Sequence, residues 1–293
     1  MAYVYDKVGT DPYSKQTPHY GSFDGDGDFI FRPQVMADAD SKTDLAIMVQ
    51  VPSTEVAVRP LSADAPTEVL KTLLPSPTDR IRLEDFVNAQ LRSVIAALNS
   101  DTFSQAAPHV EGEFERRIAA YEEVIRPLQD TVLLLAKWGE PNQLGLLEHI
   151  FARLAEADRP TTGLVRWIAL HWYPVLNLMY VAGISALSAR RFDALRASML
   201  VRVQASTHRV DGRRVELARV VGGAGVDIGE EFKRIPGYER RYTLRSDYLF
   251  NSLQAVVENH LFLGRRYNEV FNAFEVVLAL TYADGRGTED GRV

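Results

Sequence analysis

Three aspartates on alternate residues form the first group in this sequence whose spacing could do chemistry. The stretch FDGDGDF places Asp24, Asp26 and Asp28 between two phenylalanines. Alternate carboxylates open a calcium-binding loop, because hard cations take several oxygen ligands. The pattern then fails, since Phe29 stands where such a loop needs glycine and Val35 where it needs a bidentate glutamate. We expect an acidic turn here, and the sequence predicts no metal site and no cofactor.

A glycine-rich stretch, VVGGAGVDIG, follows a short apolar run and contains Gly222, Gly223, Gly225 and Gly229. Backbone amides in such a stretch can hold a phosphate at the N-terminus of a helix. The spacing matches neither the dinucleotide fingerprint nor a P-loop, because no Gly-Lys-Ser/Thr follows. We therefore expect a flexible connector between helices.

Positive charge gathers in two segments, residues 190–214 and 233–245, and the second interleaves it with aromatic residues. Basic groups beside aromatic rings are what phosphate contact and base stacking use. These segments therefore supply the predicted nucleic-acid or partner-binding residues: Arg190, Arg191, Arg196, Arg202, Arg209, Arg213, Arg214, Arg240, Arg241 and Tyr242.

The charge of the whole chain favours a protein partner over a polyanion at these segments. The net charge is −6, which leaves little long-range attraction for nucleic acid. The same arginines could form a solvated helix face or contact an acidic protein. The six histidines include no H-x-x-x-H pair, and the sequence singles out no catalytic residue. A catalytic set assembled from distant positions stays open.

The totals describe an ordinary globular chain around these groups. Of 293 residues, 46% are apolar and 25% charged, enough for a sizeable core. The absence of cysteine excludes disulfides, thiolate metal sites and cysteine nucleophiles. No basic stretch followed by an apolar one opens the chain, so no secretory leader is predicted. We expect a cytoplasmic protein that does not enter a membrane.

The pattern of apolar residues changes near residue 80. Residues 1–79 are rich in proline and glycine and alternate apolar with polar residues in LAIMVQV and EVAVRPL, which predicts a strand- and loop-rich N-terminal region. Helical spacing then begins, and we predict a mainly α fold, a multi-helix bundle, over residues 80–285. The tail 286–293 has nothing to bury and is expected to be flexible.

Two helical stretches carry specific expectations. One predicted apolar face comprises Phe114, Ile118, Tyr121, Ile125 and Leu128. Pro127 lies within this stretch and should kink the helix unless a helix boundary lies there. The stretch from Trp167 to Leu187 has no Asp, Glu, Lys or Arg and is about long enough to span a bilayer. Its proline and asparagine, and the soluble character of the remainder, favour a buried helix instead.

The helical portion resembles a known family. YEEVIRPLQDTVLLLAKWGE, WIALHWYPVLNLMYVAGISALSARRFDAL and YNEVFNAFEVVLALTYAD are similar to the C-terminal helical region of bacterial Schlafen/AlbA-type DNA-binding (ATP-binding) proteins. The shared features are an aromatic-Pro pair at Tyr173-Pro174, small residues at Ala182-Gly183 and an arginine-aromatic turn at Arg191-Phe192, within residues 110–285. The AlbA-like domain of that family has no counterpart here, so its nucleic-acid residues cannot be carried over.

The resemblance implies an accessory or sensing module that works beside an effector, in the setting of bacterial antiphage defence. We therefore expect a non-enzymatic helical interaction module that binds a protein partner or self-associates. The alternative is a nucleic-acid-binding protein that uses the segments 190–214 and 233–245.

Overall fold

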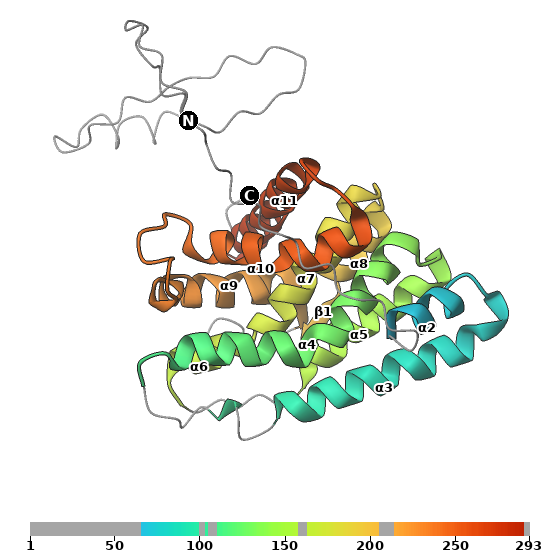
Figure 1. Cartoon of the computed structure of the whole chain (residues 1–293), viewed down its shortest axis with the longest axis horizontal. Coiled ribbons are helices and arrows are strands. Elements are labelled where there is room, and N and C mark those ends of the chain that lie inside the picture. Colours follow the sequence, from blue (N-terminus) through green and yellow to red (C-terminus); the bar gives the residue numbers. More distant parts are fainter. Residues whose placement is uncertain (1–65, 100–102, 105–109, 158–162, 205–213, 290–293) are drawn as a thin grey trace, which may run out of the picture. The chain divides into compact units, whose positions relative to one another are not determined.

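The structure, a computed structural model, describes residues 66–99, 103–104, 110–157, 163–204 and 214–289, with side chains to residue 284 (Figure 1). This part of the chain is mainly α, as predicted. The helices are α2 (Pro66–Leu73), α3 (Arg80–Leu98), α4 (Glu113–Trp138), α5 (Leu144–Glu156), α6 (Val165–Leu170), α7 (Tyr173–Ser188), α8 (Phe192–Met199), α9 (Leu217–Ile228), α10 (Leu244–Leu261) and α11 (Arg266–Glu289), with 3-10 turns η1 (Pro77–Asp79), η3 (Pro141–Gln143) and η4 (Gly229–Arg234).

Two short strands interrupt the helical succession. β1 (Arg202–Gln204) pairs antiparallel with β2 (Arg214–Glu216), and Val203 lies opposite Val215. The predicted bundle over residues 80–285 contained no strands, whereas α8 ends at Met199 and β1 follows it. The buried Val203 and exposed Arg202 and Gln204 show the period of two that belongs to a strand.

Helix α7 forms the centre of the described bundle. Every residue from Tyr173 to Ala186 is buried, and α4, α8, α9, α10 and α11 all pack against this helix. The expected buried helix from Trp167 is thus found, but a turn at His171 divides it into α6 and α7. Pro174 lies in the first turn of α7, where its missing N–H costs no hydrogen bond.

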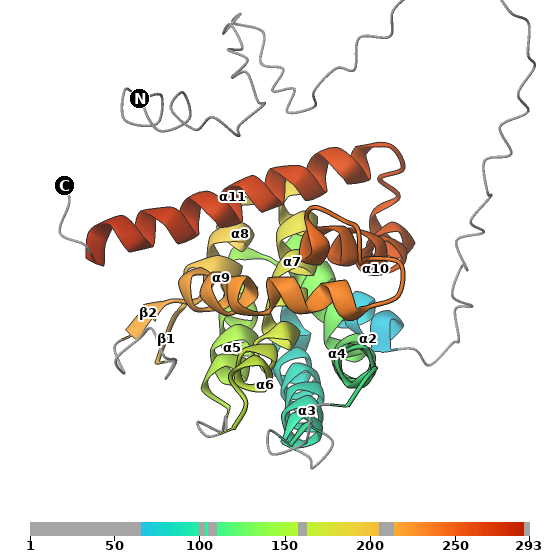
Figure 2. The ribbon, with the colours of Figure 1, turned by 90° about the vertical axis from the view of Figure 1, so that its left-hand side faces the viewer.

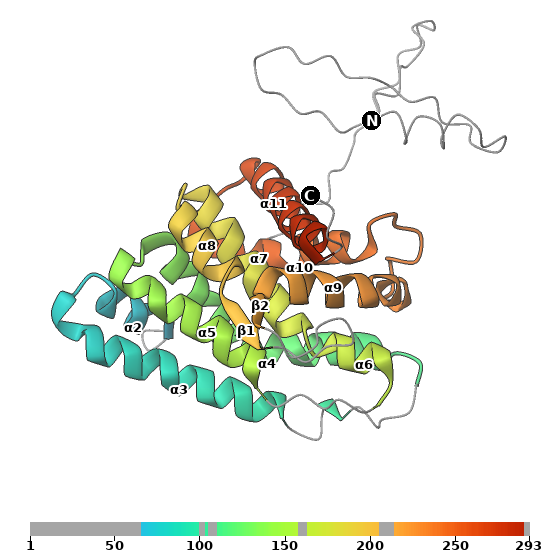
Figure 3. The ribbon, with the colours of Figure 1, turned by 180° about the vertical axis from the view of Figure 1, so that it is seen from behind.

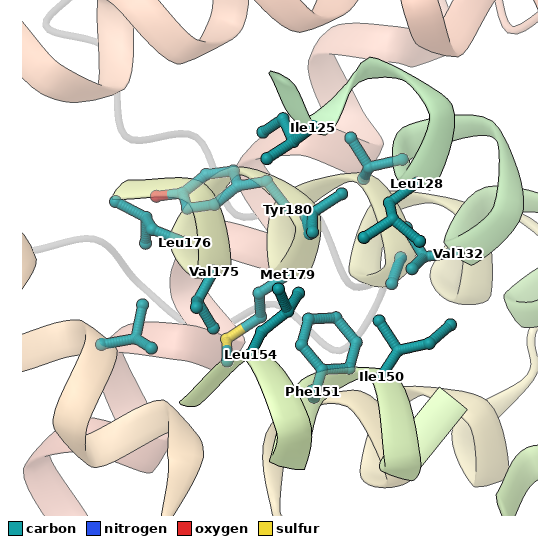
Figure 4. Close-up of a cluster of buried hydrophobic side chains, with 14 of the residues drawn as sticks. Ile125, Leu128, Val132, Ile150, Phe151, Leu154, Val175, Leu176, Met179 and Tyr180 are labelled. Atoms are coloured by element: carbon teal, nitrogen blue, oxygen red, sulfur yellow. The ribbon is translucent and has the colours of Figure 1, made fainter. Parts of the chain in front are cut away.

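The core extends from α7 to α4 and α5. Figure 4 shows the side chains that meet there: Ile125, Leu128 and Val132 from α4, Ile150, Phe151 and Leu154 from α5, and Val175, Leu176, Met179 and Tyr180 from α7. Helix α4 continues through Pro127, which lies inside it. No helix in the described residues is both long enough and apolar enough to cross a bilayer.

Outer helices close the bundle on two sides. In Figures 2 and 3, α3 lies on one side of α4 and α7, and α11 lies on the other. Helix α2 and η1 belong to the stretch assigned above to the N-terminal region, yet α2 packs on α3 and α4 and buries Leu70 and Leu73. Helix α11 continues to Glu289, into the expected tail. Residues 1–65, including the three aspartates, and residues 290–293 lie outside the described part.

The prediction of a flexible connector at the glycine-rich stretch is wrong, because this stretch forms most of α9. A Cβ at Gly222 would lie 2.9 Å from the ring of Tyr282 in α11, and one at Gly225 would lie 2.5 Å from Nη1 of Arg245. The glycines therefore let α11 and the start of α10 approach closely. Their role is in packing, a use of glycine that outweighs its low helix propensity here.

Candidate interaction surface

The predicted arginines of the first segment lie between the end of α7 and the start of β2. Arg190 lies in the turn before α8, in the left-handed region with φ of 54°, and Arg196 is exposed on α8. Arg202 is the first residue of β1 and Arg214 the first of β2, and both are exposed. Because the strands are antiparallel, Arg202 pairs with Glu216 and Arg214 pairs with Gln204. Arg209 and Arg213 lie outside the described residues.

Arg191 holds the structure together and is not free to bind a ligand. Its guanidinium donates to the carbonyl oxygens of Gly139 at 2.7 Å and Lys137 at 3.4 Å, at the C-terminus of α4. Its Nε and Nη2 also donate hydrogen bonds of 2.9 and 2.8 Å to the two carboxylate oxygens of Asp193. These contacts with Asp193 raise the pKa of Arg191 and lower that of Asp193. The residue therefore caps one helix and ties another to it.

Internal contacts also engage the two strand arginines. Arg202 Nη2 donates to the carbonyl oxygen of Arg214 at 2.8 Å, and Arg214 Nη2 lies 3.4 Å from a carboxylate oxygen of Glu156. The side chain of Arg214 is 65% exposed, so this ion pair contributes little to stability.

The second segment lies elsewhere. Arg240, Arg241 and Tyr242 are exposed in the turn between η4 and α10, and Tyr242 is 100% exposed. This turn lies on the opposite side of the described bundle from α8 (Figures 1 and 3). The structure therefore places the two arginine segments on separate surfaces.

Three exposed aromatic side chains mark the place where α4, α8 and α10 meet. Trp138 is the last residue of α4, Phe192 the first of α8, and Phe262 the C-cap of α10, and they are 61%, 66% and 84% exposed. We call these three residues the aromatic end surface. Large aromatic side chains this exposed are the kind that protein interfaces cover.

Two basic side chains bring these helix ends together. Arg191 binds the end of α4, as described above, and Lys137 Nζ donates to the carbonyl oxygen of His260 in α10 at 3.3 Å. The Lys137 ammonium also lies 4.9 Å from the centre of the Trp138 ring. Its partial burial lowers the pKa of Lys137. The arrangement fixes the base of Trp138 while its ring stays accessible.

Exposed arginines flank the aromatic end surface. Arg190 precedes Arg191 and Phe192, and Arg265 and Arg266 follow Phe262; all three flanking arginines are exposed and make no ion pair with any described residue. Asp193 is already paired with Arg191. Free guanidinium groups beside accessible aromatic rings favour a partner that offers carboxylates.

A pocket of about 710 Å³ opens next to this surface, between α5, α8 and the strands. Predicted residues Arg196 and Arg202 line it, together with Glu148, Asp193 and Glu216. Its apolar wall comes from η3, α5, α8 and the C-cap of α8: Pro141, Leu144, Ala197 and Leu200.

A buried polar network crosses the core and serves packing. Tyr173 donates to Glu122 at 2.5 Å, Gln129 donates to Asn177 at 2.8 Å, and Asn177 lies 3.4 Å from the Tyr173 hydroxyl. Burial raises the pKa of Glu122, although hydrogen bonds from Tyr173 and Tyr248 oppose the shift. None of these residues lines the pocket beside α8, and no described group of three His, Asp or Glu side chains could hold a metal.

No protein-family model, curated protein or solved structure matches this chain. The resemblance to the Schlafen/AlbA-type helical region therefore stays a prediction.

Sequence reasoning found part of this region and missed its aromatic side chains. It singled out Arg190, Arg191 and Arg196 for their charge density. The sequence contains only a weak signal for the three exposed rings, which is that each lies near a predicted helix end, in the stretches KWGE, RRFD and HLFLG. Periodicity cannot show that three such ends meet, because the contacts join residues far apart in the sequence: Lys137 and His260 are 123 positions apart, and Arg191 and Gly139 are 52 positions apart.

Proposed function

We propose that this chain is a helical interaction module, an accessory subunit that binds an acidic surface of a protein partner through the aromatic end surface. The observation that supports the proposal most directly is the exposure of Trp138, Phe192 and Phe262 on helix ends that internal contacts hold together. Tryptophan and arginine dominate the binding energy of protein interfaces. The free Arg190, Arg265 and Arg266 would pair with the partner's carboxylates around this centre.

The resemblance to the Schlafen/AlbA-type helical region suggests which kind of partner the chain binds. The partner would be the effector of a bacterial antiphage defence complex, with its chemistry carried on another polypeptide. Such a module works in the cytoplasm, which a sequence without cysteine allows. Self-association through the same surface is the competing arrangement.

The test begins with recovery of the tagged chain and its bound proteins from the native host under gentle conditions. The purified partner is then titrated against Trp138→Ala and Phe192→Ala variants. Truncation of an interface centre should weaken binding about 30-fold, since hot-spot residues cost about 2 kcal/mol or more. Ile81→Ala is the matched control, because Ile81 is 75% exposed on α3.

Ion pairs between the flanking arginines and a partner's carboxylates also predict salt dependence. The dissociation constant for the partner should rise with added salt, and Arg265→Glu should remove part of that dependence. A chain that is recovered alone and monomeric would contradict the proposal. Equal affinities for the Trp138, Phe192 and Ile81 variants would contradict the choice of surface.

Nucleic-acid binding is a second candidate, favoured by the turn before α10. Two adjacent arginines and a fully exposed tyrosine stand together there, which suits phosphate contact and base stacking. Fluorescence anisotropy with single- and double-stranded DNA and RNA across a salt series tests it. Binding that weakens steeply with salt and is lost in Arg240→Glu, but not in Arg92→Glu on α3, would support this candidate.

A further inference from the structure

The pocket beside α8 holds two charges of opposite sign that no described residue neutralises. Arg196 projects from α8 and Glu148 from α5, and both line the pocket and are exposed. Neither makes a hydrogen bond or ion pair through its side chain with any described residue, nor with the other. The pocket therefore presents one free guanidinium and one free carboxylate to whatever enters it.

The other charges on its wall are already engaged. Asp193 is held by Arg191 at 2.8 Å, Glu216 lies 3.6 Å from Arg219, and Arg202 donates to a backbone carbonyl oxygen. A carboxylate within an ion pair has less to offer a ligand than one without a partner. Arg196 and Glu148 are thus the two charged groups on the wall that have no described partner.

We propose that this pocket binds a small zwitterion of the α-amino-acid type, with its carboxylate on Arg196, its ammonium on Glu148 and an apolar side chain against Leu144 and Leu200. Arginine binds carboxylates with two parallel hydrogen bonds, and an ammonium group donates readily to a glutamate. The volume of about 710 Å³ lies within the range of small-molecule sites. Free amino acids and short peptides share this chemistry.

Ligands of a single charge fit this pocket less well. An anion that reached Arg196 would also approach the carboxylates of Glu148, Asp193 and Glu216, and a cation that reached Glu148 would approach two guanidinium groups. A molecule with both charges pairs with each free group and leaves neither repelled. The pocket lies beside the partner surface proposed above but is distinct from its rings, because Trp138, Phe192 and Phe262 do not line it.

The experiment is a titration of the full chain, followed by NMR or calorimetry, with four probes at millimolar concentrations. The probes are L-leucine, L-leucyl-L-leucine, 4-methylpentanoate and 3-methylbutylamine. L-leucine or its dipeptide should bind at least about tenfold more tightly than the singly charged compounds, since each charge-assisted hydrogen bond contributes about that factor. The ratio of the first two affinities distinguishes a free amino acid from a peptide.

Substitutions then assign the contacts. Arg196→Gln and Glu148→Gln should each weaken zwitterion binding about tenfold. Arg92→Gln and Glu84→Gln, on exposed positions of α3 away from the pocket, should leave it unchanged. The proposal is overturned if neither zwitterion binds, if they bind no better than the singly charged compounds, or if both pocket substitutions leave the affinity unchanged.

Discussion

Arg117 is a buried cation at the start of α4, 1% exposed, and a carboxylate, a backbone carbonyl and an aromatic ring contact it. Glu113 accepts from its Nε at 2.7 Å, the carbonyl oxygen of Ser104 accepts from its Nη2 at 2.6 Å, and the Trp167 ring lies 4.3 Å away. A hydrogen bond from Arg116 and a further one from Arg117 lower the pKa of Glu113 to about 2. The ionised carboxylate therefore stabilises the folded chain.

We predict that Glu113→Gln lowers the free energy of unfolding by about 2 kcal/mol at pH 7. Loss of one partner leaves a buried charge poorly compensated, and the Ser104 carbonyl moderates the cost. The contribution of Glu113 is present above its ordinary pKa of 4.5 and is lost as pH falls towards about 2. Urea unfolding at several pH values should show the difference from wild type shrinking over that window.

Glu115→Gln, on the exposed neighbour of the same turn, is the matched control and should change stability by less than about 0.5 kcal/mol. If both variants lost the same stability at every pH, the buried arginine would not depend on Glu113.

The sequence predicted the apolar side chains of this helix and could not predict Arg117. Phe114, Ile118, Tyr121, Ile125 and Leu128 form the expected face and are all buried. A glutamate four residues before an arginine is the usual pattern of an exposed helix pair. Only the tertiary contact with Trp167 shows that this arginine is covered.

At the scale of elements, close approach of helices depends on single glycines. A Cβ on Gly183 of α7 would lie 2.0 Å from a ring carbon of Phe274 in α11. Both helices bury these faces completely, so the ring has no room to move without disturbing its neighbours, among them Tyr180 at a ring separation of 4.8 Å.

Gly183→Ala should therefore destabilise the chain by about 2–3 kcal/mol, as overpacking of a core does. Gly145→Ala is the control, because a Cβ there meets no atom within 4 Å and alanine has the higher helix propensity. Thermal unfolding should show a lower melting temperature for the first variant and an equal or higher one for the second. A neutral Gly183→Ala would mean that α7 and α11 pack less tightly than described.

The elements that sequence patterns identified best are those with one apolar face or with apolar residues all round. The helix at α9 was missed because four closely spaced glycines suggested a connector, and its packing against Tyr282 and Arg245 is a tertiary contact. The strands β1 and β2 are three residues each, too short to show a period of two from sequence.

At the scale of the whole described bundle, α7 makes folding depend on helices that range from α4 to α11. Helices α10 and α11 cover α7 with Leu249, Leu253, Phe271 and Phe274, all buried. The mainly α class followed from apolar periodicity, whereas the convergence of α4, α8 and α10 at one end required the contacts of Lys137 and Arg191. Local patterns carry no information about such distant pairs.

We predict that a chain ending at Thr243, and so lacking α10 and α11, does not unfold cooperatively. Removing both helices exposes the buried face of α7 to water, with a loss far greater than the usual stability of a domain. Circular dichroism on urea titration should show a single sharp transition for the full chain and a broad, shallow one for the truncated chain. A sharp transition in both would show that the remaining helices form a core of their own.

Because Lys137 and Arg191 join distant segments, the aromatic end surface exists only in a chain that has been fully synthesised and folded. Its rings belong to segments that come together only after residues 138, 192 and 262 have all been synthesised and packed. A partner that reads all three would ignore nascent and partly unfolded copies and would bind native ones alone. Such a partner would protect mature copies from proteolysis, so the abundance of one protein in the cell would follow that of the other.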